Sequence, residues 1–320
     1  MTIPDEIADH ALRLCAALAR RGMDRRTFLG TFAAQLSSRT AAVWASGSEN
    51  QTDALRPVCG VSGYTLALQF TFGTSGKVKS IADLEALFMH DPLGAALMES
   101  CNPSSRSMCN NHVFEADSLA LTGIADGSGV YNAWGHITSG ALLTKATCFA
   151  PCIVEIIARL PAGRGVWPSL YLYDEHSGHH DSSEIDIMES QFNAPIGIRD
   201  DRSCIFQFDH GPGVGATVSS SMNRWGRWQP YGPIPDGDMS ARWAAYSVLW
   251  LPDRVSKYVD NKLGATRMFK WTGPGEPNII IYNSIGSDQS DWPGPVSADT
   301  FLGDHAKFRI KSIRVFKPNA

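Results

Sequence analysis

The feature that most constrains the fold is a series of short segments in which alternate residues are apolar. Val154, Ile156 and Ala158 share one side of an extended chain, and the residues between them point to the other side. This period of two is typical of a β-strand. We predict strands at 64–72, 112–116, 136–145, 152–160, 167–173, 184–189, 204–209, 246–251, 255–260, 278–284 and 308–317, with a short helix at 81–89.

Glycine and proline are dense between these segments, as in 211–213 and 292–295. Many short strands separated by such turns indicate an all-β fold, a β-sandwich or jelly roll of two stacked antiparallel sheets. The 320 residues contain no internal repeat and no long linker. We therefore predict an N-terminal segment over 1–55 and a single domain over 56–320.

The last predicted strand contains a change of phase. Phe308 and Ile310 share one parity, whereas Ile313 and Val315 share the other. One extra residue in a strand produces such a change, so we predict a β-bulge near 311–312.

The segment 184–189 places three carboxylates on one predicted strand. Glu184 and Asp186 point to the same face, but a regular strand would turn Glu189 toward the core. A buried, unpaired carboxylate is costly, and a β-bulge at 187–188 would return Glu189 to the face of the other two. The alternative is an ordinary acidic strand exposed to solvent.

Three carboxylates in a row are suited to glycoside hydrolysis with retention. That reaction needs two carboxyl groups about 5–5.5 Å apart, one as nucleophile and one as acid/base. The Cα atoms of Glu184 and Glu189 would lie roughly 13 Å apart along the strand, a gap that two glutamate side chains can close by leaning inward. Asp186 between them would influence which carboxyl keeps its proton.

The flanking sequence strengthens this interpretation. The stretch 159–173 reads RLPAGRGVWPSLYLY and is followed by EIDIME at 184–189. Together with 246–260, 281–286, 292–294 and 308–316, these motifs resemble glycoside hydrolase family 16, the laminarinase, lichenase and agarase group. The resemblance covers roughly 112–317. The chain departs from the family pattern at Tyr171, usually Trp, at 205–210, at 260–261, and in an insertion at 77–100.

The resemblance implies a jelly roll with a concave glycan-binding cleft. By position, Glu184 is the nucleophile, Asp186 the assisting carboxylate and Glu189 the general acid/base. The residues that it implies for substrate binding are Trp167, Tyr171, His210, Asn283 and Trp292. For each of these five residues, a purely structural role remains the alternative.

The implied function is a retaining endo-glycosidase acting on a polysaccharide, with a β-1,3- or mixed β-1,3/1,4-glucan favoured. Two alternatives remain, a transglycosylase with the same covalent step and a non-catalytic carbohydrate-binding module. We expect no required cofactor and no metal in the catalytic site, while a structural calcium ion stays open. The loop 174–181 holds three His and three acidic residues, but we interpret it as a polar edge of the cleft.

The charge balance excludes some partners. The net charge is −4 and the chain has no Lys/Arg-rich run, which argues against nucleic-acid binding. No uncharged apolar run reaches the ~18–20 residues of a membrane span. We expect a monomer whose partner is its polysaccharide substrate.

The N-terminal segment carries a pattern typical of export. Residues 24–29 resemble a twin-arginine signal, and 43–45 resembles a cleavage site, although Arg39 interrupts the apolar part. Met23 as the true start would bring the arginine pair close to the N-terminus. The alternative is an amphipathic helix over 6–21. Export would place the protein in the periplasm or outside the cell.

The cysteines fit an oxidising compartment. Removal of a signal through residue 45 would leave six of the seven, an even number compatible with disulfides. Cys148 and Cys152 are four residues apart, and in an extended chain they would lie ~13 Å apart, beyond disulfide reach. The sequence does not determine the pairing.

Overall fold

The computed structural model describes residues 56–88, 105–107, 109–131, 136–173, 184–190, 205–207, 209–210, 223–225, 240–272, 275–286 and 295–319. The chain divides into two compact units, 1–51 and 52–320. The first unit, and with it the predicted export signal, lies outside the described residues, and the boundary predicted at 55/56 stays a prediction. Among the helices that are described, none is long and apolar enough to cross a lipid bilayer.

The larger of the two main sheets has eight strands, in the order β16-β15-β14-β8-β18-β4-β3, with β1 also paired to β18. All its pairings are antiparallel. Its strands are β1 (Tyr64–Thr71), β3 (His112–Phe114), β4 (Leu119–Thr122), β8 (Cys152–Arg159), β14 (Ala244–Leu251), β15 (Arg254–Val259), β16 (Lys262–Met268) and β18 (Lys307–Pro318).

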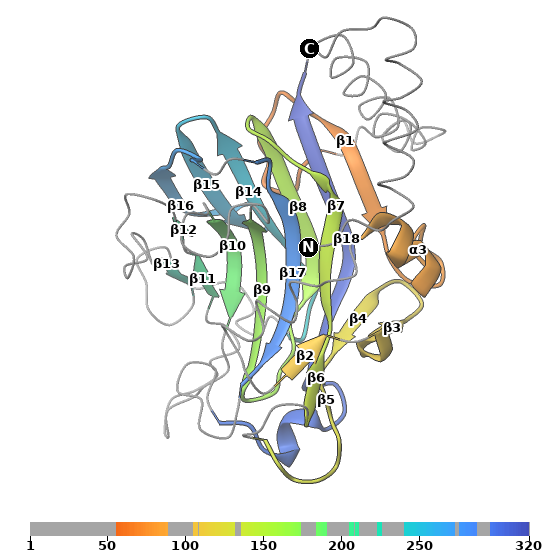
Figure 1. Cartoon of the computed structure of the whole chain (residues 1–320). Coiled ribbons are helices and arrows are strands. Elements are labelled where there is room, and N and C mark those ends of the chain that lie inside the picture. Colours follow the sequence, from red (N-terminus) through yellow and green to blue (C-terminus); the bar gives the residue numbers. More distant parts are fainter. Residues whose placement is uncertain are drawn as a thin grey trace, which may run out of the picture. The chain divides into compact units, whose positions relative to one another are not determined.

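The second main sheet has seven strands, in the order β13-β11-β10-β9-β17-β7, with β12 also paired to β10. Figure 1 shows it stacked on the eight-stranded sheet. Its strands are β7 (Ala141–Thr147), β9 (Val166–Tyr173), β10 (Glu184–Ser190), β11 (Ile205–Gln207), β12 (Asp209–His210), β13 (Asn223–Trp225) and β17 (Asn278–Ile285). The minor elements are β2 (Ser105–Ser107), β5 (Ile124–Ala125), β6 (Ile137–Ser139), α3 (Ile81–Leu87), η1 (Cys109–Asn111) and η4 (Ala298–Phe301).

The all-β sandwich predicted from the sequence is confirmed, and so are its long strands and the helix α3. Two strands of the eight-stranded sheet, β4 and β16, were not predicted from the sequence. In β4 all four residues are buried, so the strand lacks the alternation that marks a half-buried strand. Strand β16 contains Gly264 and three polar or charged residues, which weakens the apolar pattern.

The core lies between the two main sheets. On β14, Tyr246, Val248 and Trp250 are buried with at most 1% exposure and share one parity. On the facing sheet, Leu170 and Leu172 of β9 are fully buried and share the parity that points inward. The opposite parity of the seven-stranded sheet therefore forms its outer face, and this face carries the candidate site.

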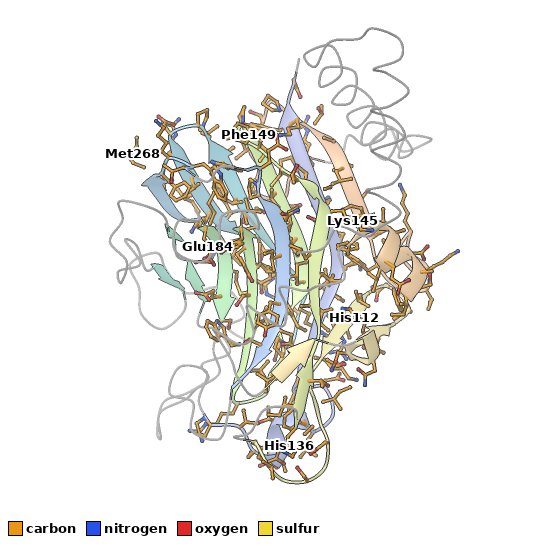
Figure 2. All side chains as sticks on the ribbon, in the orientation of Figure 1. His112, His136, Lys145, Phe149, Glu184 and Met268 are labelled. Atoms are coloured by element: carbon orange, nitrogen blue, oxygen red, sulfur yellow. The ribbon has the colours of Figure 1, made fainter. Side chains whose placement is uncertain are left out.

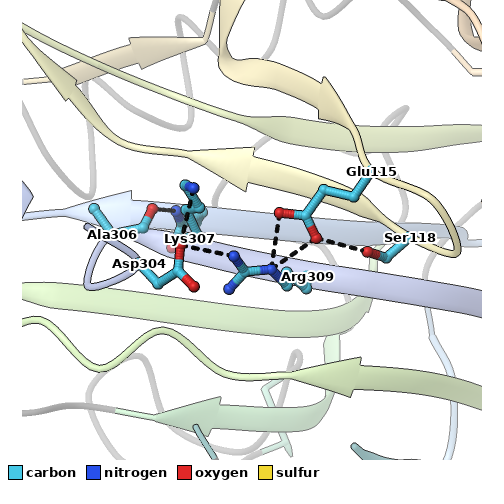
Figure 3. A network of polar contacts seen from close by, with 7 residues as sticks. Glu115, Ser118, Asp304, Ala306, Lys307 and Arg309 are labelled. Carbon is cyan, nitrogen blue, oxygen red and sulfur yellow. Dashed lines mark hydrogen bonds and ion pairs between the residues drawn. The ribbon is translucent and has the colours of Figure 1, made fainter. Parts of the chain in front are cut away.

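The bulge predicted in the last strand is confirmed. The register between β18 and β8 shifts between Ile310 and Ser312, so Lys311 is the extra residue. The same strand also fixes the loop after β3. Arg309 of β18 forms an ion pair with Glu115 of that loop at 2.8 Å and another with Asp304 at 2.8 Å (Figure 3).

Candidate active site

The acidic strand β10 lies between β9 on one side and the short strands β11 and β12 on the other. Its register with β9 shifts between Asp186 and Met188, which leaves Ile187 as an extra residue. The bulge predicted at 187–188 is therefore confirmed. Its effect is local, because pairing resumes at once with Met188 opposite Leu170.

The bulge returns all three carboxylates to one face of the sheet. They lie opposite alternate residues of β9, namely Glu184 opposite Tyr173, Asp186 opposite Tyr171, and Glu189 opposite Ser169. Residues directly opposite each other in an antiparallel pair point to the same side. We call the side that carries these carboxylates the carboxylate face; Glu184 is labelled on it in Figure 2.

Glu189 is the carboxylate with the most informative surroundings. Its Oε1 accepts a hydrogen bond of 3.1 Å from the indole N–H of Trp167. Burial and the nearby negative charge of Asp186 raise the pKa of Glu189 well above its ordinary value. The Trp167 hydrogen bond and the positive charge of Lys257 lower that pKa, but they only partly offset the increase. Glu189 therefore keeps its proton to higher pH than an ordinary glutamate.

Lys257 influences the pKa of Glu189 although it lies outside the carboxylate face, and this influence was not predicted from the sequence. It lies on β15 in the other sheet and is 1% exposed. It shares the inward parity of Val255 and Val259, two buried apolar residues. The sequence does contain a signal for it, because a lysine occupies a position with the same parity as the apolar core residues of the strand. A lysine at such a position is rarely buried without a partner.

Two predicted substrate residues lie on the carboxylate face. Trp167 is partly exposed, and its N–H is engaged by Glu189. Tyr171 is only 7% exposed, so little of its ring is open for stacking on a sugar. Its ring packs in a cluster of apolar and aromatic residues on β7, β9 and β17, formed by Leu143, Tyr171, Tyr173, Ile280 and Tyr282.

Asn283 is placed on the other side of its strand. It pairs with Pro168 of β9, so it has the parity opposite to Trp167. It is fully buried, and its amide donates to the carbonyl of Leu121 at 2.8 Å and to that of Ala306 at 2.9 Å. Asn283 was predicted near the cleft as a substrate residue; the structure places it between the sheets, on the side of β17 opposite the carboxylate face.

The remaining predictions fall wholly or partly outside the described residues. The backbone of His210 pairs with that of Glu184, which brings β12 beside the acidic strand. Trp292 and the loop 174–181 are not described, so their roles stay predictions. Within the described part of the chain, no group of three or more His, Cys, Asp or Glu side chains is placed to hold a metal ion.

No protein-family model matches the chain. In sequence, it is 25% identical over 209 residues to glucan endo-1,3-beta-glucosidase A1 of Niallia circulans. That match covers 58% of this chain and 27% of the relative, so the chain spans about a quarter of that longer protein.

Solved structures share the fold. The endo-beta-1,3-glucanase of Pyrococcus furiosus is 21% identical with a TM-score of 0.61, covering 80% of this chain and 95% of that one. The laminarinase catalytic domain of Thermotoga maritima is 21% identical with a TM-score of 0.56, covering 80% and 99%. The Bacillus licheniformis beta-glucanase is 16% identical with a TM-score of 0.56, covering 78% and 97%. The predicted fold and the predicted resemblance to the laminarinase and lichenase group are thereby confirmed.

Proposed function

We propose that this protein is a retaining endo-β-glucanase of the glycoside hydrolase family 16 type. It would hydrolyse internal bonds of a β-1,3- or mixed β-1,3/1,4-glucan through a covalent glycosyl-enzyme. The enzymes of similar fold and the relative of similar sequence carry names of β-glucanases, which supports this substrate class.

The observation that carries the proposal is the pair of glutamates on the bulged strand. Glu184 and Glu189 flank Asp186 on one face, and Glu189 has a pKa raised by burial and by Asp186. A general acid must still hold its proton at the pH of the reaction. A solvated acidic strand would give neither the bulge nor the raised pKa.

In the proposed first step, Glu189 donates its proton to the leaving glycosidic oxygen while the Glu184 carboxylate attacks the anomeric carbon. The bond to the leaving sugar breaks as the bond to Glu184 forms. In the second step, Glu189, now a carboxylate, takes a proton from water, and the oxygen of that water displaces Glu184. The charge of Asp186 supports the first step because it favours the protonated form of Glu189.

The test is activity on purified polysaccharides, with laminarin and mixed-linkage β-glucan compared with xyloglucan, agarose and carrageenan. We expect Glu184→Gln and Glu189→Gln each to reduce kcat by at least ~10³-fold while the protein stays folded. Glu85→Gln, on the exposed surface of α3, is the matched control and should retain full activity. Hydrolysis by Glu184→Gln at the wild-type rate would exclude the mechanism.

The same assays separate the alternatives. Products longer than the substrate would identify a transglycosylase, because the acceptor would then be a sugar in place of water. Binding without cleavage by the wild-type protein would identify a carbohydrate-binding module.

Export, a monomeric state and the absence of a required cofactor complete the proposal. The twin-arginine pattern at 24–29 supports export, since a secreted enzyme meets polysaccharides that cannot enter a cell. The proposal neither requires nor excludes a structural calcium ion, and it does not include nucleic acid as a partner.

A further inference from the structure

Two cysteines lie at the corner where the chain passes from one main sheet to the other. Strand β7 of the seven-stranded sheet ends at Thr147, and strand β8 of the eight-stranded sheet begins at Cys152. Only four residues separate these strand ends, and Phe149 among them is labelled in Figure 2. Cys148 is the first residue of this corner, and Cys152, which follows the corner, is the first residue of β8.

Each cysteine is fixed to a different sheet. The backbone N–H of Cys148 donates to the carbonyl of Pro277 at 3.0 Å, which continues the pairing between β7 and β17. Cys152 pairs with Trp250 of β14 in the other sheet. Because the chain turns between them, the expectation of two sulfur atoms far apart on an extended chain does not hold.

The two side chains meet inside the sandwich. Cys148 is 1% exposed and Cys152 is fully buried. The thiol of Cys148 donates a hydrogen bond of 3.9 Å to the carbonyl of Pro277, and the thiol of Cys152 is close enough to influence its proton. Both residues are free thiols in this structure.

We propose that Cys148 and Cys152 form an intramolecular disulfide that ties the two sheets together at this corner. The oxidant is a small or protein disulfide, such as oxidised glutathione. One thiolate attacks it, which forms a mixed disulfide and releases one equivalent of reduced thiol. The second cysteine then attacks the mixed disulfide, closes the Cys148–Cys152 bond and releases the second equivalent.

The timing of this oxidation follows from the burial of the pair. The neighbouring thiol of Cys152 and burial raise the pKa of the Cys148 thiol well above its ordinary value. Because the thiolate is the reacting species, exchange in the folded protein is slow. Oxidation is therefore fastest while the chain folds, before the corner is packed.

Cys59 provides a matched control. It is also a buried free thiol, but it packs against Ile153 and Phe316. Ile153 has the parity opposite to Cys152, so Cys59 lies on the outer side of β8 and Cys152 on the inner side.

The experiment maps one tryptic peptide of the full chain. Cleavage after Lys145 and Arg159 yields peptide 146–159, which contains both cysteines of the corner. The protein is refolded from urea with oxidised and reduced glutathione, alkylated with iodoacetamide without reduction, digested and analysed by mass spectrometry. We expect the peptide to be unalkylated and lighter than the dithiol peptide by two hydrogen atoms. A doubly alkylated peptide, or one linked to another cysteine peptide, would overturn the proposal.

Thermal unfolding gives a second readout. Reduction should lower the Tm of the oxidised wild-type protein by about 4–8 °C, as expected for a short closed loop in a domain of this size. The Tm of Cys59→Ser should fall by the same amount on reduction. The Cys148→Ser/Cys152→Ser protein should lose this shift; if it retains the shift, another pair of cysteines is responsible. Should that variant fail to fold, the wild-type peptide map alone decides.

Discussion

Glu189 is subject to opposing influences on its proton. Burial and Asp186 favour the protonated form, whereas the indole of Trp167 and the charge of Lys257 favour the carboxylate. The two proposed catalytic steps require both forms in turn, since in that mechanism Glu189 acts first as acid and then as base. A donor that holds Glu189 in place and moderates its pKa serves both steps. This gives Trp167 a positioning role in addition to the substrate contact predicted from the sequence.

Trp167→Phe tests that role. The variant keeps an aromatic ring but removes the N–H that lowers the pKa of Glu189. The pKa should therefore rise further, and the basic limb of the kcat/KM profile should move to higher pH by about 1 unit. The measurement is the pH dependence of kcat/KM on the preferred glucan.

Trp271→Phe is the control for this prediction. The indole of Trp271 also donates a hydrogen bond, to the carbonyl of Gly275 at 3.0 Å, but its ring packs against Phe269 and Trp250. Among the described residues, Trp271 is not one of those that shift the pKa of Glu189. Its pH profile should match that of the wild type. An unchanged basic limb in Trp167→Phe would mean that the indole does not influence the proton of Glu189.

Among the features of the strands, the bulges in β10 and β18 were the most predictable. The carboxylates of β10 and the apolar residues of β18 change parity within their strand. A single extra residue in each strand returns them to one face. Such a change of parity is visible in the sequence because the residues before and after the extra residue must turn their apolar side chains toward the same core. The placement of Glu184, Asp186 and Glu189 in one row was predictable for this reason.

Features that depend on distant partners were not predictable in this way. Asn283 binds carbonyls at Leu121 and Ala306, which are far from it in sequence. Cys148 and Cys152 meet only because the chain changes sheet between them. Local periodicity contains no information about such contacts, so the family pattern suggested a cleft position for Asn283 and an extended chain suggested separated cysteines.

Asn283→Ala distinguishes a structural role from a substrate role. The substitution removes both donors and leaves two buried carbonyls without this partner, so it should lower the free energy of unfolding by about 2 kcal/mol. The KM and kcat of the folded protein should not change. Urea denaturation and steady-state kinetics measure the two quantities.

Asn319→Ala, at an exposed position after β18, should leave both the stability and the kinetics of the enzyme at wild-type values. A raised KM in Asn283→Ala, without any loss of stability, would restore the substrate role.

In the molecule as a whole, the outer faces of the two main sheets are used differently. The outer face of the seven-stranded sheet carries the carboxylates, whereas part of the outer face of the other sheet is covered by the segment 56–61. Glu155 of β8 is fully buried there and is paired with Arg314 of β18. It also accepts hydrogen bonds from the backbone N–H of Val58 at 2.7 Å and from the hydroxyl of Ser247 at 3.1 Å. One carboxylate thus joins four segments that are distant in sequence.

Glu155→Gln is expected to weaken the whole domain. The substitution keeps the size of the side chain but leaves the guanidinium of Arg314 buried without its counter-charge. Breaking one side of a buried pair typically costs about 3–5 kcal/mol, which urea denaturation would detect as a lower midpoint with an unchanged slope. Asp117→Asn, which breaks an exposed pair with Lys311, should cost no more than about 1 kcal/mol. Equal losses in the two variants would mean that the buried pair is not a link between these segments. Because the pair lies on the sheet opposite the carboxylates, we expect Glu155→Gln to keep wild-type kinetics below its unfolding transition.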